Sequence, residues 1–198
     1  MNLIRKIFLL FIMLVFLYHS KGQDNISLKF KTISLNPAGN INSGIMTNNF
    51  DSKGVMVFEP GIELSYEFFV MDIIKSVRFT KGLYVDGANQ FAGYLSLGMW
   101  WRVYEKWRHS LRGGIGPALN YRSTWYYMEG YKKDGWIGTD NFQHYIMFNA
   151  GLEFNYYLSK KSEVTISTSI SHPWGISISG GYRFWISRKI VHRKSCNC

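Results

Sequence analysis

Alternation of apolar and polar residues runs through most of this chain and restricts the folds open to it. Residues 54–69 place Met56 and Phe58 in one phase, and Glu59 and Glu63 in the other. Successive side chains of a strand point to opposite faces of a sheet, so each such segment predicts a strand with one apolar and one polar face. A helix would mix the two sets. The pattern therefore predicts an all-β fold.

Eight segments show this alternation, at residues 26–35, 54–69, 73–84, 91–104, 110–123, 141–158, 163–171 and 175–187. An even number of antiparallel strands can close into a barrel with both chain ends on one side. The second, fourth and sixth links are short, whereas two of the odd links, residues 36–53 and 124–140, are long. Short turns at one rim and long loops at the other are typical of outer-membrane barrels. We predict an eight-stranded antiparallel up-and-down transmembrane β-barrel over residues 23–187.

The N-terminus carries the features of a secretory signal peptide over residues 1–22. Arg5 and Lys6 precede twelve apolar residues at positions 7–18, and Gly22 supplies a small residue before the expected cleavage site. Twelve helical residues rise about 18 Å, less than a hydrocarbon core of about 30 Å, which disfavours a retained membrane anchor. No apolar run of that kind follows, so the mature chain would cross a membrane only through strands.

Alternation alone fits two kinds of barrel. A membrane barrel is apolar outside, whereas a soluble barrel of the lipocalin kind is apolar inside. The polar phase of this chain is rich in glycine and serine, and small residues suit the crowded interior of an eight-stranded barrel. We therefore predict that the apolar phase, including Leu97 and Phe148, faces lipid. The polar phase, including Glu63 and Arg112, would line the lumen.

The polar phase also carries charges of both signs. Opposite charges enclosed in one lumen can pair, which reduces the free-energy cost of burying them. The predicted lumen network consists of Glu59, Glu63, Glu67, Arg78, Arg102, Arg112, Glu153 and Arg183. Aromatic residues near the strand ends are predicted to form girdles at the two membrane interfaces. These are Phe68, Phe69, Tyr84, Trp100, Trp101, Tyr121, Trp125, Tyr126, Tyr156, Tyr157, Phe184 and Trp185.

Two prolines lie inside predicted strands. Pro60 and Pro117 each neighbour a glycine, and a proline leaves one hydrogen bond of the strand ladder unmade. We therefore predict a bulge or a kink at each position, towards the rim that carries the long loops.

In these features the chain resembles the small eight-stranded outer-membrane barrels of the outer-membrane protein A and X type. The resemblance covers about residues 24–187 and includes the aromatic-rich last strand, with the sequence GGYRFW at residues 180–185. It implies the barrel fold and a place in the outer membrane of a bacterium, and it implies no particular activity. A basic tail at residues 188–198 follows the last strand, which departs from the terminal aromatic residue of such barrels.

The most distinctive loop is residues 124–140, which mixes aromatic and charged side chains. Such rings bind partner proteins or glycans, or contact lipopolysaccharide headgroups. The alternative is a self-packed loop whose rings lie in the outer interface. Arg122, just before the loop, would bind phosphate or pair with a lumen glutamate. The predicted contact residues of the loop are Trp125, Tyr126, Tyr131 and Trp136.

Catalytic candidates are few. Ser171, His172 and Asp140 would meet at the loop-side rim if the barrel closes as predicted, and a hydroxyl, an imidazole and a carboxylate are the groups of acyl-transfer sites. The chain lacks the His-x-Ser spacing that a deacylase-like site would need. A lipid A-modifying enzyme of the same fold, a deacylase or an acyltransferase, is therefore the alternative to a non-enzymatic role.

Nothing in the sequence indicates a cofactor. Cys196 and Cys198 end the chain with His192 nearby, and three donors fall short of the four that structural zinc prefers. The formal net charge of +10 accompanies no nucleic-acid-binding motif, whereas a basic tail suits anionic lipid. We predict a non-enzymatic outer-membrane protein that binds at the surface or stabilises the membrane. Its expected partners are outer-membrane lipid and lipopolysaccharide, with an extracellular protein or glycan as a candidate ligand.

Overall fold

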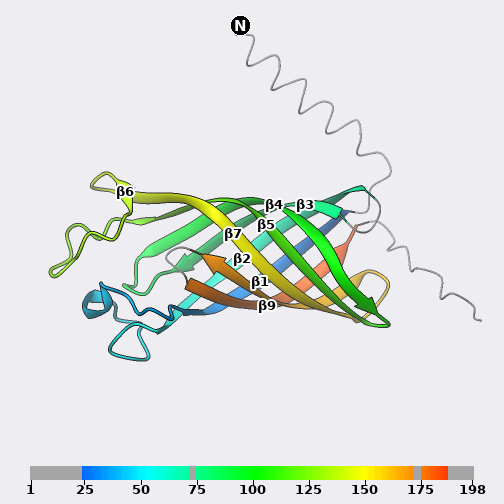
Figure 1. Ribbon diagram of the computed structural model, residues 1–198, viewed down its shortest axis with the longest axis horizontal. Coiled ribbons are helices and arrows are strands. Elements are labelled where there is room, and N and C mark those ends of the chain that lie inside the picture. Colours follow the sequence, from blue (N-terminus) through cyan, green and yellow to red (C-terminus); the bar gives the residue numbers. More distant parts are fainter. Residues whose placement is uncertain (1–23, 72–74, 172–174, 187–198) are drawn as a thin grey trace, which may run out of the picture.

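The computed structural model describes residues 24–71, 75–171 and 175–186. Eight long strands form a barrel (Figure 1). They are β1 (Asp24–Leu35), β2 (Met56–Met71), β3 (Lys75–Val85), β4 (Phe91–Lys106), β5 (His109–Ser123), β7 (Phe142–Tyr157), β8 (Ser162–Ser171) and β9 (Gly175–Trp185). Two short elements lie in the loops, the 3-10 turn η2 (Ser43–Ile45) and the strand β6 (Ile137–Gly138). No helix in the described ranges is long and apolar enough to span a membrane.

The strands form one antiparallel ring. The hydrogen-bonded order is β5-β4-β3-β2-β1-β9-β8-β7, and a direct pairing of β5 with β7 closes it. β6 adds two residues at the edge of β7. The predicted eight-stranded up-and-down barrel is therefore confirmed, with strand limits that differ from the expected ones by a few residues at each end. β6 is the one strand that the alternation did not predict.

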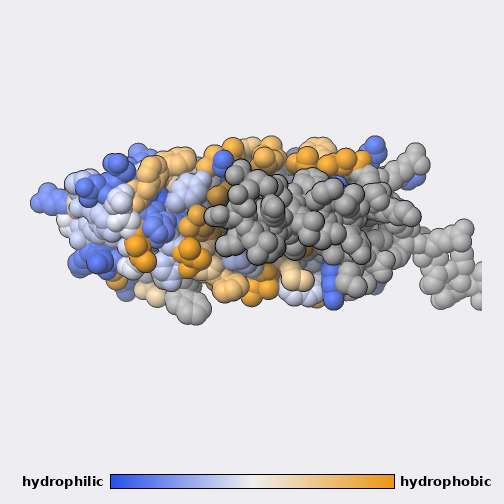
Figure 2. Space-filling view, turned by 90° about the horizontal axis from the view of Figure 1, so that it is seen from above, coloured by the Kyte–Doolittle hydropathy of each residue, from blue (hydrophilic) through white to orange (hydrophobic). Residues whose placement is uncertain are grey.

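The apolar phase of the strands faces outward. Phe148 is 70% exposed and Leu97 is 52% exposed, whereas Glu63 and Arg112 are 4% and 3% exposed. Figure 2 shows hydrophobic side chains along the barrel wall and hydrophilic ones gathered at the end that carries the loops. The soluble alternative, with its apolar side chains enclosed, is therefore wrong for this chain.

Several aromatic residues predicted for the interfacial girdles lie in the lumen instead. Trp185 is 4% exposed, and Tyr84 lies under the ammonium group of Lys31, 3.5 Å from its ring centroid. The Trp100 ring occupies space that glycine leaves open, since a Cβ atom on Gly114 would lie 2.3 Å from it. These residues belong to the polar phase of their strands. Large rings there fill gaps between small residues, which chain position alone did not indicate.

The two strand prolines differ. The pairing of β1 with β2 shifts by one residue opposite Pro60, which makes a bulge. At Pro117 the ladder between β4 and β5 stops after Ser96 and resumes at Met99 in the same register. Pro117 therefore interrupts hydrogen bonding without inserting a residue.

The barrel has two unlike ends. β1 begins and β9 ends at what we call the turn end, while residues 36–55, 86–90 and 124–141 form connections at the opposite loop end (Figure 1). The predicted signal peptide, residues 1–22, and the predicted tail, residues 188–198, lie outside the described residues.

Candidate binding site at the loop end of the barrel

Five charged side chains meet inside the lumen, in the half of the barrel nearer the end where β1 begins and β9 ends. Arg78 reaches Glu67 at 3.0 Å and Glu153 at 2.8 Å. Arg112 also pairs with Glu67, and Arg183 pairs with Glu153. None of the five residues is more than 3% exposed. Burial of this kind is tolerated only when each charge has partners, and here every arginine faces a glutamate from another strand.

Other charged residues surround this network or lie apart from it. Lys29, from β1, lies 3.2 Å from Glu153 and 3.9 Å from Glu63. Glu59 lies towards the loop end, where it accepts a 2.5 Å hydrogen bond from Lys31. Arg102 lies opposite Arg112 in the strand register but pairs with Glu105 of its own strand. The structure therefore brings six of the eight predicted residues into one connected network, and Glu59 and Arg102 make separate pairs.

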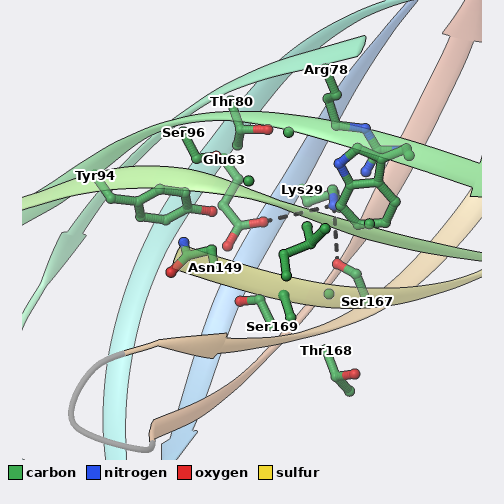
Figure 3. A pocket seen from close by; sticks show the side chains of 17 residues that line it. Lys29, Glu63, Arg78, Thr80, Tyr94, Ser96, Asn149, Ser167, Thr168 and Ser169 are labelled. Atoms are coloured by element: carbon green, nitrogen blue, oxygen red, sulfur yellow. Dashed lines mark hydrogen bonds and ion pairs between the residues drawn. The ribbon is translucent and has the colours of Figure 1, made fainter. Parts of the chain in front are cut away.

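A small cavity of about 50 Å³ adjoins the network (Figure 3). Glu63 and Lys29 line it together with Thr80 and Ser167, and the hydroxyl of Tyr94 points towards Glu63 in this view. A space of that size holds at most a few water molecules. Side chains therefore fill the described interior of the barrel at this level.

Above the lumen, loop residues pack together over the loop end and form what we call the cap. Met46, Val57, Ala88 and Trp125 are its buried core. Val57 belongs to β2 and the other three come from three different connections. The long loops are thus folded against each other and against the short connection at residues 86–90.

Asp86 anchors Trp125 in the cap. The indole Nε1 of Trp125 donates to Oδ2 of Asp86 at 2.8 Å. The backbone N–H groups of Ala88 and Gln90 donate to Oδ1, at 3.0 and 2.8 Å. Burial raises the pKa of Asp86 to about 6, although these hydrogen bonds act in the opposite direction. A single carboxyl group therefore orders one short loop and holds the indole of another.

Asn42 ties the two long loops together. Its Nδ2 donates to the carbonyl of Lys132 at 2.9 Å and to Asp134 at 3.1 Å. Its Oδ1 accepts from the backbone N–H of Lys132 at 2.7 Å. Asn42 is 1% exposed, so these bonds satisfy an amide that is shielded from water.

Arg122 lies between two tryptophan rings. Its guanidinium carbon is 3.8 Å from the ring centroid of Trp125 and 4.3 Å from that of Trp136. Its nitrogens donate to Asp134 at 3.0 Å and to Gln143 at 2.7 Å. Arg122 therefore does not make the expected pair with a lumen glutamate. Arg122 lies near the loop end of β5, where a carboxylate of the loop that follows reaches it.

A cavity of about 340 Å³ lies beneath the cap. Its lining combines aromatic rings, amides and charged groups of both signs from barrel and loops. The residues that line it include Lys31, Asn36, Asn40, Glu59, Asp86, Arg122, Trp125, Asp134 and Trp136. Two of its cations already have acidic partners, since Lys31 pairs with Glu59 and Arg122 with Asp134. The cavity therefore offers hydrogen-bonding groups and ring faces without an unpaired cation.

The predicted contact residues of the loop come together, but they face one another. Trp125 and Trp136 are 2% and 9% exposed. Tyr131 packs edge-on against both Trp125 and Tyr126, and its hydroxyl donates to Asp134 at 2.7 Å. The rings therefore build the cap rather than an open contact surface, which agrees with the self-packed alternative. The rings pack over the loop end of the barrel, whereas the self-packed alternative placed them in the outer membrane interface.

Two important cap residues gave no signal in the sequence. Asp86 precedes Gly87, a pair that indicates a turn but does not indicate a tryptophan partner 39 positions away. Asn42 is one of several asparagines in its loop. Their roles depend on how the loops pack against each other, which periodicity does not report.

The catalytic candidates do not form a described site. Asp140 is exposed on the loop that precedes β7 and accepts a hydrogen bond from the hydroxyl of Tyr127. Ser171 is the last residue of β8, and His172 lies outside the described residues. Cys196 and Cys198 also lie outside them. In the part of the chain that is described, no three His, Cys, Asp or Glu side chains gather as a metal site requires.

The comparisons with known proteins concern the fold. The sequence matches no protein family and no curated protein. The crystal structure of Neisserial surface protein A (NspA) superposes on this chain with a TM-score of 0.53 and a sequence identity of 10%. The match covers 82% of this chain and 96% of the NspA chain.

Two further structures are similar at lower TM-scores. The N-terminal β-barrel domain of Pseudomonas aeruginosa OprF is 13% identical, with 83% of this chain and 99% of that one covered and a TM-score of 0.49. The attachment invasion locus protein Ail of Yersinia pestis is 12% identical, with 82% and 97% covered and a TM-score of 0.43. The closed ring of eight antiparallel strands and the likeness to NspA together give this chain the fold of the small eight-stranded outer-membrane β-barrels.

Proposed function

We propose that the protein resides in a bacterial outer membrane and binds a saccharide, without catalysis, in the cavity beneath its cap. An outward apolar phase and a charged interior support the membrane placement, because lipid tolerates few charges on the outer face of a barrel. The turn end would then face the periplasm and the loop end the exterior, as is usual for such barrels.

Transport through the lumen is not part of this proposal. Eight strands leave an interior just wide enough for side chains. In this chain the central ion-pair network, with Arg78, Glu67 and Glu153 at most 2% exposed, occupies that space. The filled lumen favours a role at the surface of the barrel over one as a channel.

The observation that carries the proposal is the composition of the 340 Å³ cavity. Trp125 and Trp136 line it with aromatic rings that also pack on Arg122, and Asn36 and Asn40 supply amide groups. Amphipathic rings beside polar groups recognise ligands that are apolar on one face and polar at the edge. A sugar ring with neutral hydroxyl groups meets that description. An anionic ligand fits less well, because Lys31 and Arg122 are already paired with acids.

The binding test uses the refolded, detergent-solubilised barrel and a panel of neutral and acidic oligosaccharides. Intrinsic tryptophan fluorescence during titration measures affinity. We expect a neutral sugar to bind, and we expect Trp136→Ala to abolish the signal while Tyr127→Ala, which removes a ring that is 73% exposed, leaves it unchanged. Binding that survives Trp136→Ala and disappears with Tyr127→Ala would move the site to the outer surface of the loop.

Two further measurements test the other parts of the proposal. Unboiled protein in detergent should migrate differently from boiled protein on a gel, and identical migration would argue against a membrane barrel. Mass spectrometry of lipid A from cells with and without the gene tests the enzymatic alternative. An altered acyl pattern would replace the non-enzymatic role with a lipid-modifying one.

A further inference from the structure

A third cavity lies on the outer wall of the barrel. This groove has a volume of about 370 Å³ and crosses β4, β5, β7 and β8. Gly113 and Ala150 lie on its floor, where the absence of larger side chains leaves the wall recessed. Trp101, Val103, Leu152 and Ile170, which stand around it, are all between 39% and 65% exposed. The groove is therefore an apolar recess in the face that the proposed function places against lipid.

The strand register shows what lies at its end. Lys75 of β3 pairs with Trp101, Trp101 pairs with Gly113, and Gly113 pairs with Leu152. Residues paired in this way project to the same face of the sheet. Along this row an exposed lysine is thus followed by an aromatic ring and then by a position without a side chain. Lys75 is the first residue of β3, so its end of the row lies at the turn end.

The turn that follows β4 adds two more cations and an exposed indole. Lys106 ends β4, five residues beyond Trp101, and Trp107 and Arg108 connect β4 to β5. All three residues are exposed, Trp107 by 84%. Trp107 has a backbone φ of +56°, a value that residues other than glycine rarely adopt. The two-residue hairpin loop between Lys106 and His109 favours a positive φ at this position. Tryptophan favours the headgroup region of a membrane, and the flanking cations favour anionic lipid.

We propose that the groove and this basic turn together bind one anionic phospholipid. An acyl chain lies along the recess over Gly113, and Lys75, Lys106 and Arg108 hold the phosphate of the headgroup. The inference depends on the membrane placement in the proposed function and is independent of the saccharide site. The site combines an apolar recess with positive charge towards the turn end. A basic side chain near a membrane surface strengthens binding of anionic lipid by about fivefold.

The experiment places the barrel in phosphatidylcholine bilayers that contain increasing fractions of brominated phosphatidylglycerol or brominated phosphatidylcholine. Bromine quenches nearby tryptophans, and Trp101 lies in the groove. We expect the glycerol lipid to quench at a several-fold lower fraction than the choline lipid. Lys75→Gln with Lys106→Gln and Arg108→Gln should remove this preference and keep the quenching by the choline lipid. Gly113→Leu should weaken the preferential quenching by filling the recess.

Matched controls separate the site from general effects. Lys53→Gln with Lys132→Gln and Lys133→Gln removes the same charge from exposed positions at the loop end and should keep the preference. Gly180→Leu also adds a side chain to the barrel wall, where a Cβ atom would meet only the Thr165 carbonyl, 3.7 Å away.

Each outcome decides a different statement. Equal quenching by both lipids, or loss of preference in the loop-end triple variant, would overturn the phospholipid site while leaving the barrel in the membrane. Quenching by neither lipid would mean that the barrel is not in the bilayer, and the proposed function would fail as well.

Discussion

Glu67 holds the greatest number of arginine contacts in the lumen. It faces Arg112, Arg78 and Arg183, and its side chain is fully buried. Removing one partner from such a group leaves uncompensated charges in a space shielded from water, which costs about 3–5 kcal/mol. We therefore expect Glu67→Ala to lower the free energy of unfolding by about that amount. Urea unfolding of the barrel in detergent, followed by electrophoretic mobility, measures it.

The control for this prediction is Glu105→Gln at the exposed turn end. Glu105 pairs with Arg102, and exposed pairs contribute only about 0–1 kcal/mol. If Glu67→Ala and Glu105→Gln lowered the free energy of unfolding equally, the central network would not hold the barrel together as described.

Asp86 makes the cap sensitive to pH. Its pKa is about 6 in the folded protein because burial disfavours the carboxylate, and its ordinary value is 3.8. The folded cap therefore binds more protons than open loops between these two values, and its stability falls as the pH rises through 6. The charges that act on Asp86 are Glu59, which raises its pKa, and Arg122, which lowers it.

The titration is measurable at the indole N–H of Trp125, which donates to Asp86. We expect its NMR chemical shift to change with a midpoint near pH 6, and we expect Asp86→Asn to remove that change. A shift that stays constant between about pH 4.5 and 7.5 in the unmodified protein would contradict a buried, titrating Asp86.

At the scale of single strands, β4 and β5 leave no room for a side chain at Gly116, where their ladder is interrupted. A Cβ atom on Gly116 would lie 2.1 Å from the carbonyl oxygen of Leu97 and 2.4 Å from Cα of Gly98. Both are backbone atoms, so the strands would have to separate. We expect Gly116→Ala to lower the free energy of unfolding by about 1–3 kcal/mol, the usual range for overpacking.

Gly180→Ala provides the comparison for this prediction, because its wall position is open and surface changes usually stay within about 0.5 kcal/mol. The same urea unfolding experiment serves both variants. A loss for Gly180→Ala as large as that for Gly116→Ala would show that glycine itself, and not the close approach of β4 to β5, determines the effect.

The strands could be predicted because the alternation of apolar and polar residues depends only on near neighbours in the sequence. Whether Phe148 or Glu63 faces outward follows from neighbours two residues away, and the structure agrees on both. Pairing across the lumen is not local. Arg112 and Arg183 meet Glu67 from different sides of the ring, and alternation gives the face of each residue without its height in the barrel. Arg102 was therefore assigned to the lumen network, although its partner is Glu105 of the same strand.

The cap was the least predictable part of the molecule. Loop residues have no period, so the aromatic composition of residues 124–140 indicated contacts but not their partners. In the structure those contacts are made within the chain, by Trp125 with Asp86 and by Arg122 with Trp136. The sequence thus left open whether the rings form a contact surface or pack on one another, and it did not indicate the space beneath them.

For the molecule as a whole, the arrangement of its interior decides what can pass through it. Arg78 lies 3.7 Å from the ring centroid of Trp100, and both residues line the 50 Å³ cavity beside the ion-pair network. We expect liposomes containing the unmodified barrel to retain glucose as well as protein-free liposomes do. Replacing both residues, by Arg78→Ala with Trp100→Ala, joins the cavity to the space they vacate and should increase the leak of small ions. The exposed Trp107→Phe variant should behave like the unmodified protein. Rapid release of glucose by the unmodified barrel would mean that its lumen conducts, because a sugar is far larger than the space these side chains leave open.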